Sequence, residues 1–536
     1  MSDMARRELL ISNFRNITAD RDGNPVRLLV NRNLSRDGLG GIVLLIGSNN
    51  SGKSNVLDAV DRSLNGGFRK EDVTDFVMDA PEPELRWMID GDRFRKDTEN
   101  GEQPQDDAPD EEGRGLVGKL FSRIKKVADE VTDSTIDVGP DRSFNADAFE
   151  EGYGYRMSNE AVMYRRHTLR QKDLRCSPDS LNPFFRMLFS ALGIDEEDVR
   201  KSSATPGKHR VEMEKRIDSS MKTISDDLND MLGSEGKRYS LRIRIEKGSV
   251  ELSVDVGSAA LVLDRQSEGF RWLFDFYFGT MFQNASEPGT MILIDEYGDR
   301  LNFATLRSLT GKLRTIARKR GLTFIFATQN PMAIDSRHLD EVRLVVPDGE
   351  GSSVIVNEFE SFGSKDSEVA KGIIDGLLVS RNYMRKGTRR TVFTEDPETY
   401  LVMNAFSSIL SEGDGTDADF IPIGSVADLD LDPEGAVETM MSLESRPTVL
   451  AAHEGSPLYS AASDGGLKPF TFAEMPGNGS SWKDLFSEKD REKYSIDNMD
   501  TDDLVSFTKW IDGHEDELDD GTWSNFTKAM DYISLG

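Results

Sequence analysis

Apolar residues along the chain gather in short runs and in helical repeats, separated by polar stretches. Three apolar runs, at residues 42–46, 291–294 and 323–327, predict strands that are buried on both faces. Residues 209–232 carry apolar side chains at three- and four-residue spacing, which predicts an amphipathic helix, and residues 181–192 also predict a helix. Residues 239–256 alternate between apolar and polar positions, which predicts a hairpin.

The two ends of the chain predict further strands. Residues 9–17 predict a strand and a turn, and residues 26–30 predict a strand that we expect to pair with residues 42–46. Beyond residue 388 three predicted strands alternate with two predicted helices, at residues 391–395, 398–410, 419–424, 433–445 and 447–452. This order predicts a small parallel α/β domain, which a helical and acidic stretch follows.

The charge of the chain is strongly negative. Its 536 residues include 96 acidic and 66 basic ones, for a net charge of −30 at pH 7, which argues against a uniformly basic nucleic-acid coat. Residues 155–176 form a basic cluster that fits phosphate backbones and the chain's own acids equally well, so nucleic acid stays an open partner. Residues 96–115 are rich in Asp, Glu, Gly, Pro and Gln, so we expect a disordered insertion there and an amphipathic helix at residues 116–131.

Cysteine content and hydropathy indicate the compartment. Cys176 is the single cysteine, so the chain has no internal disulfide framework and no metal cluster built from cysteines alone. No apolar run is long enough to span a membrane, and the first residues lack the apolar region of a signal peptide. We therefore expect a cytoplasmic protein without membrane contact.

The strand at residues 42–46 leads into a glycine-rich loop. Residues 47–54, Gly-Ser-Asn-Asn-Ser-Gly-Lys-Ser, fit G-x-x-x-x-G-K-[ST] at every fixed position. Gly47 and Gly52 let backbone N–H groups converge on phosphate oxygens, and the helix that follows adds its positive N-terminal end. Lys53 is expected to reach the β- and γ-phosphates of ATP, and Ser54 to hold Mg²⁺. The predicted nucleotide-binding residues of this loop are Asn49, Asn50, Ser51, Gly52, Lys53, Ser54 and Asn55.

The apolar run at residues 291–294 ends in two acids, Asp295 and Glu296. A buried strand followed by two acids matches the Walker B pattern, in which Asp295 binds the Mg²⁺ shell and Glu296 polarises the attacking water. Asp295 comes 242 residues after Lys53. This distance predicts an ATPase whose two halves are separated by an inserted lobe.

Ser267 and Gly269 extend this pattern. Ser-x-Gly before an apolar helix resembles the signature of ABC-type ATPases related to chromosome-maintenance and recombination proteins, although Phe270 replaces a second glycine. The resemblance implies that Ser267 and Gly269 contact ATP held by the opposite protomer. Two chains would then sandwich two ATP molecules as a homodimer.

The same resemblance bears on three other positions. It implies a nucleotide contact for Arg15, which as an isolated residue is equally compatible with an ordinary surface arginine. Gln329 stands where that family usually has a histidine on the γ-phosphate, and Tyr297 stands where it has a proline after the two acids. Glutamine can hydrogen-bond a phosphate oxygen but carries no charge, so the turnover rate is left open.

The C-terminal strand pattern resembles another group. Glu395 closes the strand at residues 391–395, as a glutamate does in the Toprim domain of topoisomerases, primases and OLD-family (overcoming lysogenization defect) nucleases. Those nucleases join such a domain to the same kind of ATPase, which implies a metal-binding role for Glu395 beside an Asp-x-Asp pair. Here that place reads His453-Glu454, and the alternating acids at residues 428–432 follow the second strand instead. We therefore expect a degenerate Toprim-like domain.

These observations predict an α/β protein, an ABC-type P-loop ATPase head split by an inserted helical lobe and followed by a small parallel Toprim-like domain. The expected divisions are the ATPase N-terminal half, the inserted segment with lobe and hairpin, the ATPase C-terminal half and the Toprim-like domain, at residues 1–95, 96–262, 263–387 and 388–536. The expected function is binding and hydrolysis of ATP with Mg²⁺ in a homodimer or higher homo-oligomer. The resemblance to the OLD family implies a role in anti-phage defence or DNA processing, either as an ATP-driven sensor or scaffold for an effector protein or as an ATP-gated nuclease.

Overall fold

The computed structural model describes residues 6–20, 22–34, 40–74, 81–90, 160–164, 169–204, 208–232, 238–246, 248–278, 288–348, 351–364, 374, 376–377, 390–411, 418–427, 429, 432–476 and 479–535. Several predictions lie outside these residues, namely the insertion at 96–115, the helix at 116–131, the basic residues Arg156, Arg165, Arg166 and His167, and the acids Asp428 and Asp430.

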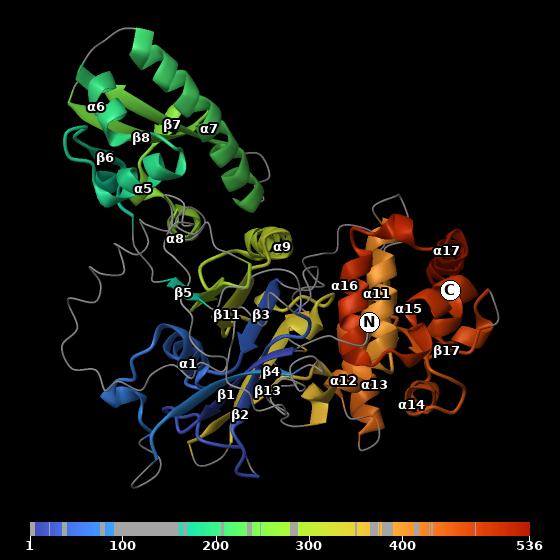
Figure 1. Cartoon of the computed structure of the whole chain (residues 1–536). Helices are drawn as coiled ribbons and strands as arrows, with labels where there is room; N and C mark the ends of the chain where they lie inside the picture. The colour runs from blue at the N-terminus through green and yellow to red at the C-terminus, as the bar shows by residue number, and fades with distance from the viewer. Residues whose placement is uncertain are drawn as a thin grey trace, which may run out of the picture.

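The centre of the molecule is a six-stranded sheet (Figure 1). Its order is β13 (Ser353–Val356), β12 (Val342–Pro347), β3 (Gly41–Ile46), β11 (Thr323–Thr328), β10 (Met291–Ile294) and β5 (Ala161–Tyr164). All neighbours are parallel except β13, which runs antiparallel to β12. The three apolar runs predicted as buried strands are therefore β3, β10 and β11, which lie side by side in this sheet.

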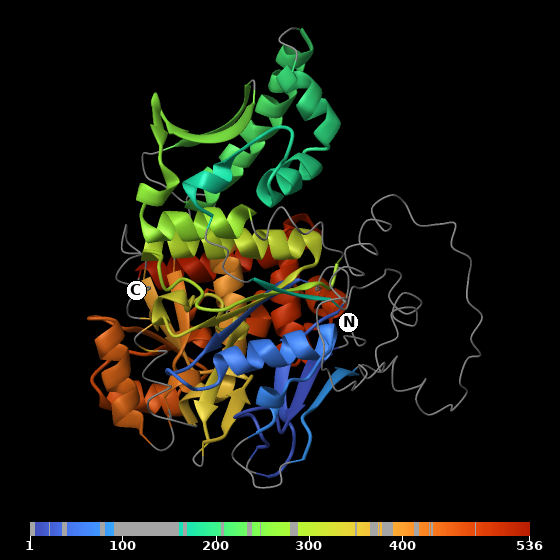
Figure 2. The same ribbon diagram turned by 90° about the vertical axis from the view of Figure 1, so that its left-hand side faces the viewer.

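Helices cover both faces of the sheet. The side chains of β3 alternate between two cores: Ile42, Leu44 and Ile46 join one, and Val43 and Leu45 join the other. Helix α9 (Phe303–Arg320) packs in the first core and α1 (Lys53–Asn65) in the second, on opposite sides of the strands (Figure 2). Burial on both faces is the reason these strands are continuously apolar.

A second, antiparallel sheet of three strands lies over the core that contains α1. Its order is β2 (Val26–Asn31), β1 (Arg6–Ser12) and β4 (Glu84–Asp90). The prediction that residues 26–30 pair with residues 42–46 was wrong, because β2 pairs with β1. Both edges of β3 are taken by β11 and β12, so β2 meets β3 only through side chains, with Leu28 and Val43 in the same core.

The elements between β5 and α8 stand apart from the main sheet, at the top of Figure 1. They are β6 (Arg175–Cys176), α5 (Pro183–Ala191), α6 (Glu196–Ala204), α7 (Lys208–Leu232), β7 (Tyr239–Glu246), β8 (Ser249–Val256) and β9 (Ala259–Leu261). Helix α8 (Glu268–Phe276) packs against the edge strand β5 instead, where the rings of Trp272 and Phe276 contact Tyr164. The predicted amphipathic helix is α7, and the predicted hairpin is β7 with β8, paired from Tyr239 with Val256 to Glu246 with Ser249.

The elements from β14 to α17, called the C-terminal unit below, surround a four-stranded parallel sheet. Its order is β15 (Ala418–Pro422), β14 (Arg390–Thr394), β16 (Thr448–Ala451) and β17 (Phe470–Thr471). The helices are α11 (Pro397–Ser411), α12 (Ile423–Val426), α13 (Pro433–Leu443), α14 (Pro457–Asp464), α15 (Glu488–Tyr494), α16 (Thr501–Ile511) and α17 (Asp520–Leu535). No helix in the described part of the chain is long and apolar enough to cross a membrane.

Candidate functional site

The phosphate loop, residues 47–54, connects the end of β3 to the start of α1. A Cβ atom at Gly47 would lie 2.3 Å from the Val345 carbonyl oxygen, so only glycine fits beside β12. Gly52 has φ 93°, and a Cβ there would lie 2.7 Å from the Asn16 amide nitrogen. Asn50 is also left-handed, with φ 62°, a conformation that asparagine tolerates better than most residues. The two glycines are thus needed for the path of the loop.

Lys53 folds back over this loop. Its Nζ donates to the carbonyl oxygens of Gly47, at 3.0 Å, and Ser48, at 2.6 Å. Burial lowers the pKa of Lys53, while the carboxylates of Asp295 and Asp299 oppose that shift. The side chain therefore lies between the loop and the acids at the end of β10.

Those acids have an unusual backbone. Glu296 has φ 52°, and its N–H donates to Asp295 Oδ1 at 2.9 Å. Tyr297 fixes the following turn: its N–H donates to the Ala327 carbonyl at 2.9 Å, and its buried ring stacks on Phe326 at a centroid distance of 3.8 Å. The strained conformation of Glu296 is held by the packing of its neighbour, as is common at functional sites.

These groups line one cavity of about 570 Å³ at the carboxyl ends of β3, β10 and β11. Ten predicted site residues line it: Arg15, Asn49, Asn50, Gly52, Lys53, Ser54, Asn55, Asp295, Glu296 and Gln329. Ser51 is buried beneath the loop instead. Ser267, Gly269 and Glu395 do not line the cavity.

Several lining residues were not predicted. Thr328 and Asp299 face each other, with Thr328 Oγ1 donating to Asp299 Oδ1 at 3.1 Å. Each lies within four positions of a predicted residue, so the ends of β10 and β11 could have been used to predict both of them. Asn16 directly follows the predicted Arg15, whereas Gly351 comes from a turn far away in the sequence that no motif marks.

Arg15 lines the cavity but is engaged by the chain itself. Its guanidinium donates to Asp72 and to Asp58, with ion-pair distances of 2.7 Å and 2.6 Å, and to Asn55 Oδ1 at 3.0 Å. Burial disfavours the charged form, yet the hydrogen bonds to Asp72 and Asp58 raise the pKa of Arg15. Arg15 therefore ties the turn after β1 to α1, and Asn55 in turn donates to Asn16 Oδ1 at 2.6 Å.

Ser267 and Gly269 form the start of α8. Ser267 Oγ accepts the Phe270 N–H at 3.2 Å and so caps the helix. A Cβ at Gly269 would lie 2.7 Å from the Arg300 carbonyl, which accounts for glycine at this position. Both residues therefore have local roles that are independent of a nucleotide.

Glu395 follows β14 in the C-terminal unit. Its carboxylate accepts the N–H groups of Ala452, at 3.3 Å, and Leu458, at 3.4 Å, and so fixes the loop between β16 and α14. Asp432 Oδ1 accepts the Gly435 N–H at 2.9 Å as the cap of α13. Among the described residues, no group of three or more His, Cys, Asp and Glu side chains is placed to hold a metal ion.

One family model matches the part of the chain that contains the phosphate loop and the two acids. The family model described as "AAA domain, putative AbiEii toxin, Type IV TA system" matches residues 42–335, more than half of the chain. No curated protein matches the chain.

Three solved structures are similar to it. They are an SmcHead bound to the C-winged helix domain of ScpA, the SMC head domain from Thermotoga maritima, and an Smc head domain with an extended coiled coil bound to the C-terminal domain of ScpA derived from Pyrococcus furiosus. Their identities are 15%, 12% and 13%, and their TM-scores are 0.36, 0.29 and 0.31. Each match covers 66% of this chain and 96%, 98% and 96% of the other.

Proposed function

Since the chain belongs to the P-loop ATPase family described as "AAA domain, putative AbiEii toxin, Type IV TA system", we propose that it binds and hydrolyses ATP in the cavity beside the phosphate loop. The observation that carries this proposal is the convergence of Lys53, Ser54, Asp295 and Glu296 on that cavity. Ligands of open α/β sheets bind beyond the carboxyl ends of the strands, and the cavity lies at those ends of β3, β10 and β11.

The residues fit an ATP–Mg²⁺ complex. Lys53 exchanges its two carbonyl acceptors for phosphate oxygens, a gain because hydrogen bonds between charged partners are stronger. Ser54 and Asp295 offer the hydroxyl and carboxylate oxygens that Mg²⁺ prefers. Mg²⁺, when bound, neutralises charge on the β- and γ-phosphate oxygens.

Hydrolysis requires a base and a contact for the γ-phosphate. Glu296 accepts a proton from the attacking water. As the proton leaves, the oxygen of the water bonds to the γ-phosphorus, and the bond between that phosphorus and the bridging β-phosphate oxygen breaks. Gln329 hydrogen-bonds the γ-phosphate from the end of β11. Asn49, Asn50, Gly52 and Asn55 shape the remaining wall.

We extend the proposal to a dimer. Ser267 and Gly269 lie at the N-terminal end of α8 and do not line their own chain's cavity. A helix N-terminus attracts phosphate, so we assign these residues to ATP held by a second copy. In this arrangement the elements between β5 and α8 form a lobe inserted between the two ATPase halves. The lobe starts after β5, because that strand belongs to the main sheet, and we keep the other boundaries given above.

For the biological role we favour an ATP-driven sensor or scaffold that controls a separate effector protein in bacterial defence. The family description names a putative toxin of a toxin–antitoxin system, which supports a defence role. Glu395 is engaged by two backbone N–H groups, which supports a structural rather than a metal-binding role. The second candidate is an OLD-type nuclease, and a glutamate at the end of a central parallel strand favours it.

Two substitutions test the ATPase assignment. We expect Lys53→Ala to abolish ATP binding, because it removes the only cation of the phosphate loop. We expect Glu296→Gln to retain binding and to slow hydrolysis by roughly 10²–10⁴-fold, because glutamine cannot accept the proton. The measurements are equilibrium ATP binding and phosphate release, with the exposed Lys172→Ala as a control. Equal hydrolysis by the wild type and both site variants would contradict the assignment.

A further inference from the structure

The β11–β12 segment, residues 329–341, begins in the nucleotide cavity. Gln329 lines the cavity, and Asn330 Nδ2 donates to the Gly298 carbonyl at 3.4 Å, in the turn after the acids. Asn330 Oδ1 also accepts the Met332 N–H at 3.0 Å, which starts the short helix η6 (Pro331–Ala333). The first residues of the segment are thus tied to the turn that positions Glu296.

The far end of the same segment is held by the C-terminal unit. Tyr400 of α11 is fully buried, and its hydroxyl donates to the Ser336 carbonyl at 2.9 Å and accepts the Leu339 N–H at 3.0 Å. Arg337 pairs with Asp419 of β15 at 2.7 Å. One side chain of the C-terminal unit therefore satisfies two backbone groups of the segment at once.

Between these ends the segment is braced by α9. Arg314 makes two hydrogen bonds to Glu341, at 2.9 Å and 2.8 Å, and lies 3.7 Å from Asp335. Arg307 pairs with Asp335 at 2.9 Å. Packed and paired groups shift together rather than deform, so a displacement at Tyr400 is passed on to Gln329.

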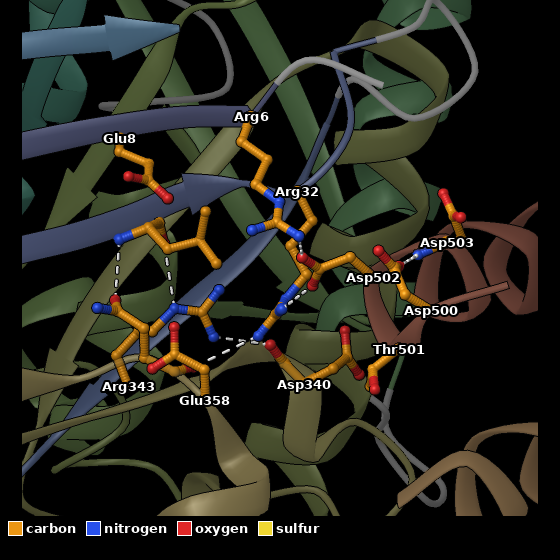
Figure 3. A network of polar contacts seen from close by, with 12 residues as sticks. Arg6, Glu8, Arg32, Asp340, Arg343, Glu358, Asp500, Thr501, Asp502 and Asp503 are labelled. Atoms are coloured by element: carbon orange, nitrogen blue, oxygen red, sulfur yellow. Dashed lines mark hydrogen bonds and ion pairs between the residues drawn. The ribbon is translucent and has the colours of Figure 1, made fainter. Parts of the chain in front are cut away.

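Helix α16 docks the C-terminal unit against the same region. Asp502 in its first turn pairs with Arg6, the first residue of β1, and with Arg32, which follows β2 (Figure 3). Near the other end of α16, Lys509 pairs with Asp340 at 2.5 Å. Asp512, directly after the helix, pairs with Arg318 of α9. A cavity of about 300 Å³ remains at this boundary, between α9, α11 and α16.

We propose that Tyr400 is a positioning residue for ATP turnover: by bridging Ser336 and Leu339 it fixes the β11–β12 segment, and through that segment it sets the position of Gln329 in the nucleotide cavity. The C-terminal unit thereby controls the ATPase site without touching ATP. This inference rests on the proposed ATPase function. Burial raises the pKa of the Tyr400 hydroxyl well above its usual value, so the group stays protonated as a donor at physiological pH.

The test compares two tyrosines of the C-terminal unit. Tyr400→Phe removes only the bridging hydroxyl. Tyr494→Phe is the matched control, because the Tyr494 hydroxyl donates to the Glu517 carbonyl at 3.2 Å within the C-terminal unit. We expect Tyr400→Phe to lower kcat about tenfold while KM for ATP changes less than about twofold, because small misplacements near a reacting group reduce rate more than binding. Tyr494→Phe should leave both constants unchanged.

Two further measurements separate positioning from simple destabilisation. Backbone hydrogen exchange in residues 331–341 should be faster in Tyr400→Phe than in Tyr494→Phe, although the two variants have the same unfolding midpoint. Asp419→Asn weakens a second, independent contact of the segment, the ion pair with Arg337. This variant should also lower kcat, and it replaces Tyr400→Phe in the test if Tyr400→Phe does not fold. If the wild type hydrolyses ATP while kcat and exchange are the same in all three variants, this inference is wrong and the proposed function stands. If the wild type neither binds nor hydrolyses ATP, the proposed function itself fails.

Discussion

Glu296 shows how one residue can be both strained and fixed. A glutamate at φ 52° is costly, since non-glycine residues rarely adopt left-handed conformations. Tyr297 compensates by packing: its ring stacks on Phe326 and its hydroxyl shares a hydrogen bond with Thr310 Oγ1 at 2.7 Å. Tyr297, which stands where the resembled family has a proline, is therefore a core residue in this chain. Its position in the sequence alone does not reveal this role.

His338 predicts a pH dependence of stability. It lines the cavity between α9, α11 and α16, and burial and the neighbouring Arg314 lower its pKa to about 4. The unfolded chain binds this proton near the usual value of 6.5, so the unfolded state binds more protons between those two pH values. Stability is therefore full above about pH 6.5 and falls by about 1–3 kcal/mol as the pH drops towards 4. The charged groups that face His338 are Asp335, Asp340 and Glu341 on its own segment, Arg314 of α9 and Lys509 of α16.

The measurement is the unfolding midpoint of the wild type and of His338→Gln at about pH 7.5 and about pH 5. We expect the wild type to lose more stability than the variant on acidification, because glutamine does not titrate. An equal loss in both would show that other groups cause the effect.

At the scale of elements, sequence patterns predicted most of the fold. The apolar runs predicted as strands buried on both faces are β3, β10 and β11, and the helix predicted for residues 209–232 is α7. The pairing partner of a strand was harder to predict than the strand itself. Strand β2 is mostly apolar, like β3, and the sequence gives no sign that both edges of β3 are occupied by strands some 300 residues later.

The position of Ser267 at the start of α8 predicts that two inactive variants restore ATPase activity when they are mixed. If Ser267 contacts ATP held by a second copy, mixing Lys53→Ala with Ser267→Ala chains should restore ATPase activity, because each heterodimer keeps one intact site. Ser267 also caps α8, so Ser267→Ala should cost about 1 kcal/mol of stability. Ser267→Asn, which keeps a capping oxygen, controls for that cost. No recovery of activity, although both variants form dimers, would contradict action across the interface.

At the scale of the molecule, the site is assembled from six separated parts of the chain. The phosphate loop and the two acids carry recognisable spacing, so most of the cavity wall was predictable. Asn16 joins the wall because the turn after β1 lies between α1 and β13: Asn16 accepts a hydrogen bond from Asn55 of α1 and donates to Ser353 Oγ of β13 at 2.9 Å. Such a contact between residues 337 positions apart depends on sheet packing, which local patterns do not encode.

The C-terminal unit predicts no strong intrinsic nuclease activity. One carboxylate holds Mg²⁺ weakly, because stripping its water shell is costly, and Glu395 already accepts two backbone N–H groups. The assay is cleavage of plasmid, linear and single-stranded DNA and of RNA with Mg²⁺ or Mn²⁺, with and without ATP. Glu395→Gln is the informative variant, because glutamine removes the charge and keeps an oxygen for one of the two N–H groups. Robust cleavage by the wild type that disappears in this variant would restore the nuclease interpretation.

The strand order of the main sheet determines how long β3 waits for its neighbouring strands during synthesis of the protein. Gly41 of β3 pairs with Thr323 of β11, which leaves the ribosome 282 residues later. At the usual 5–20 residues per second, this delay is roughly 15–60 s. During that time the apolar run of β3 has neither of its neighbours, and such exposed strands are prone to aggregate. Nascent chains stalled before residue 323 should therefore be cleaved by protease near residues 41–54, whereas chains that extend beyond β12 should be protected there.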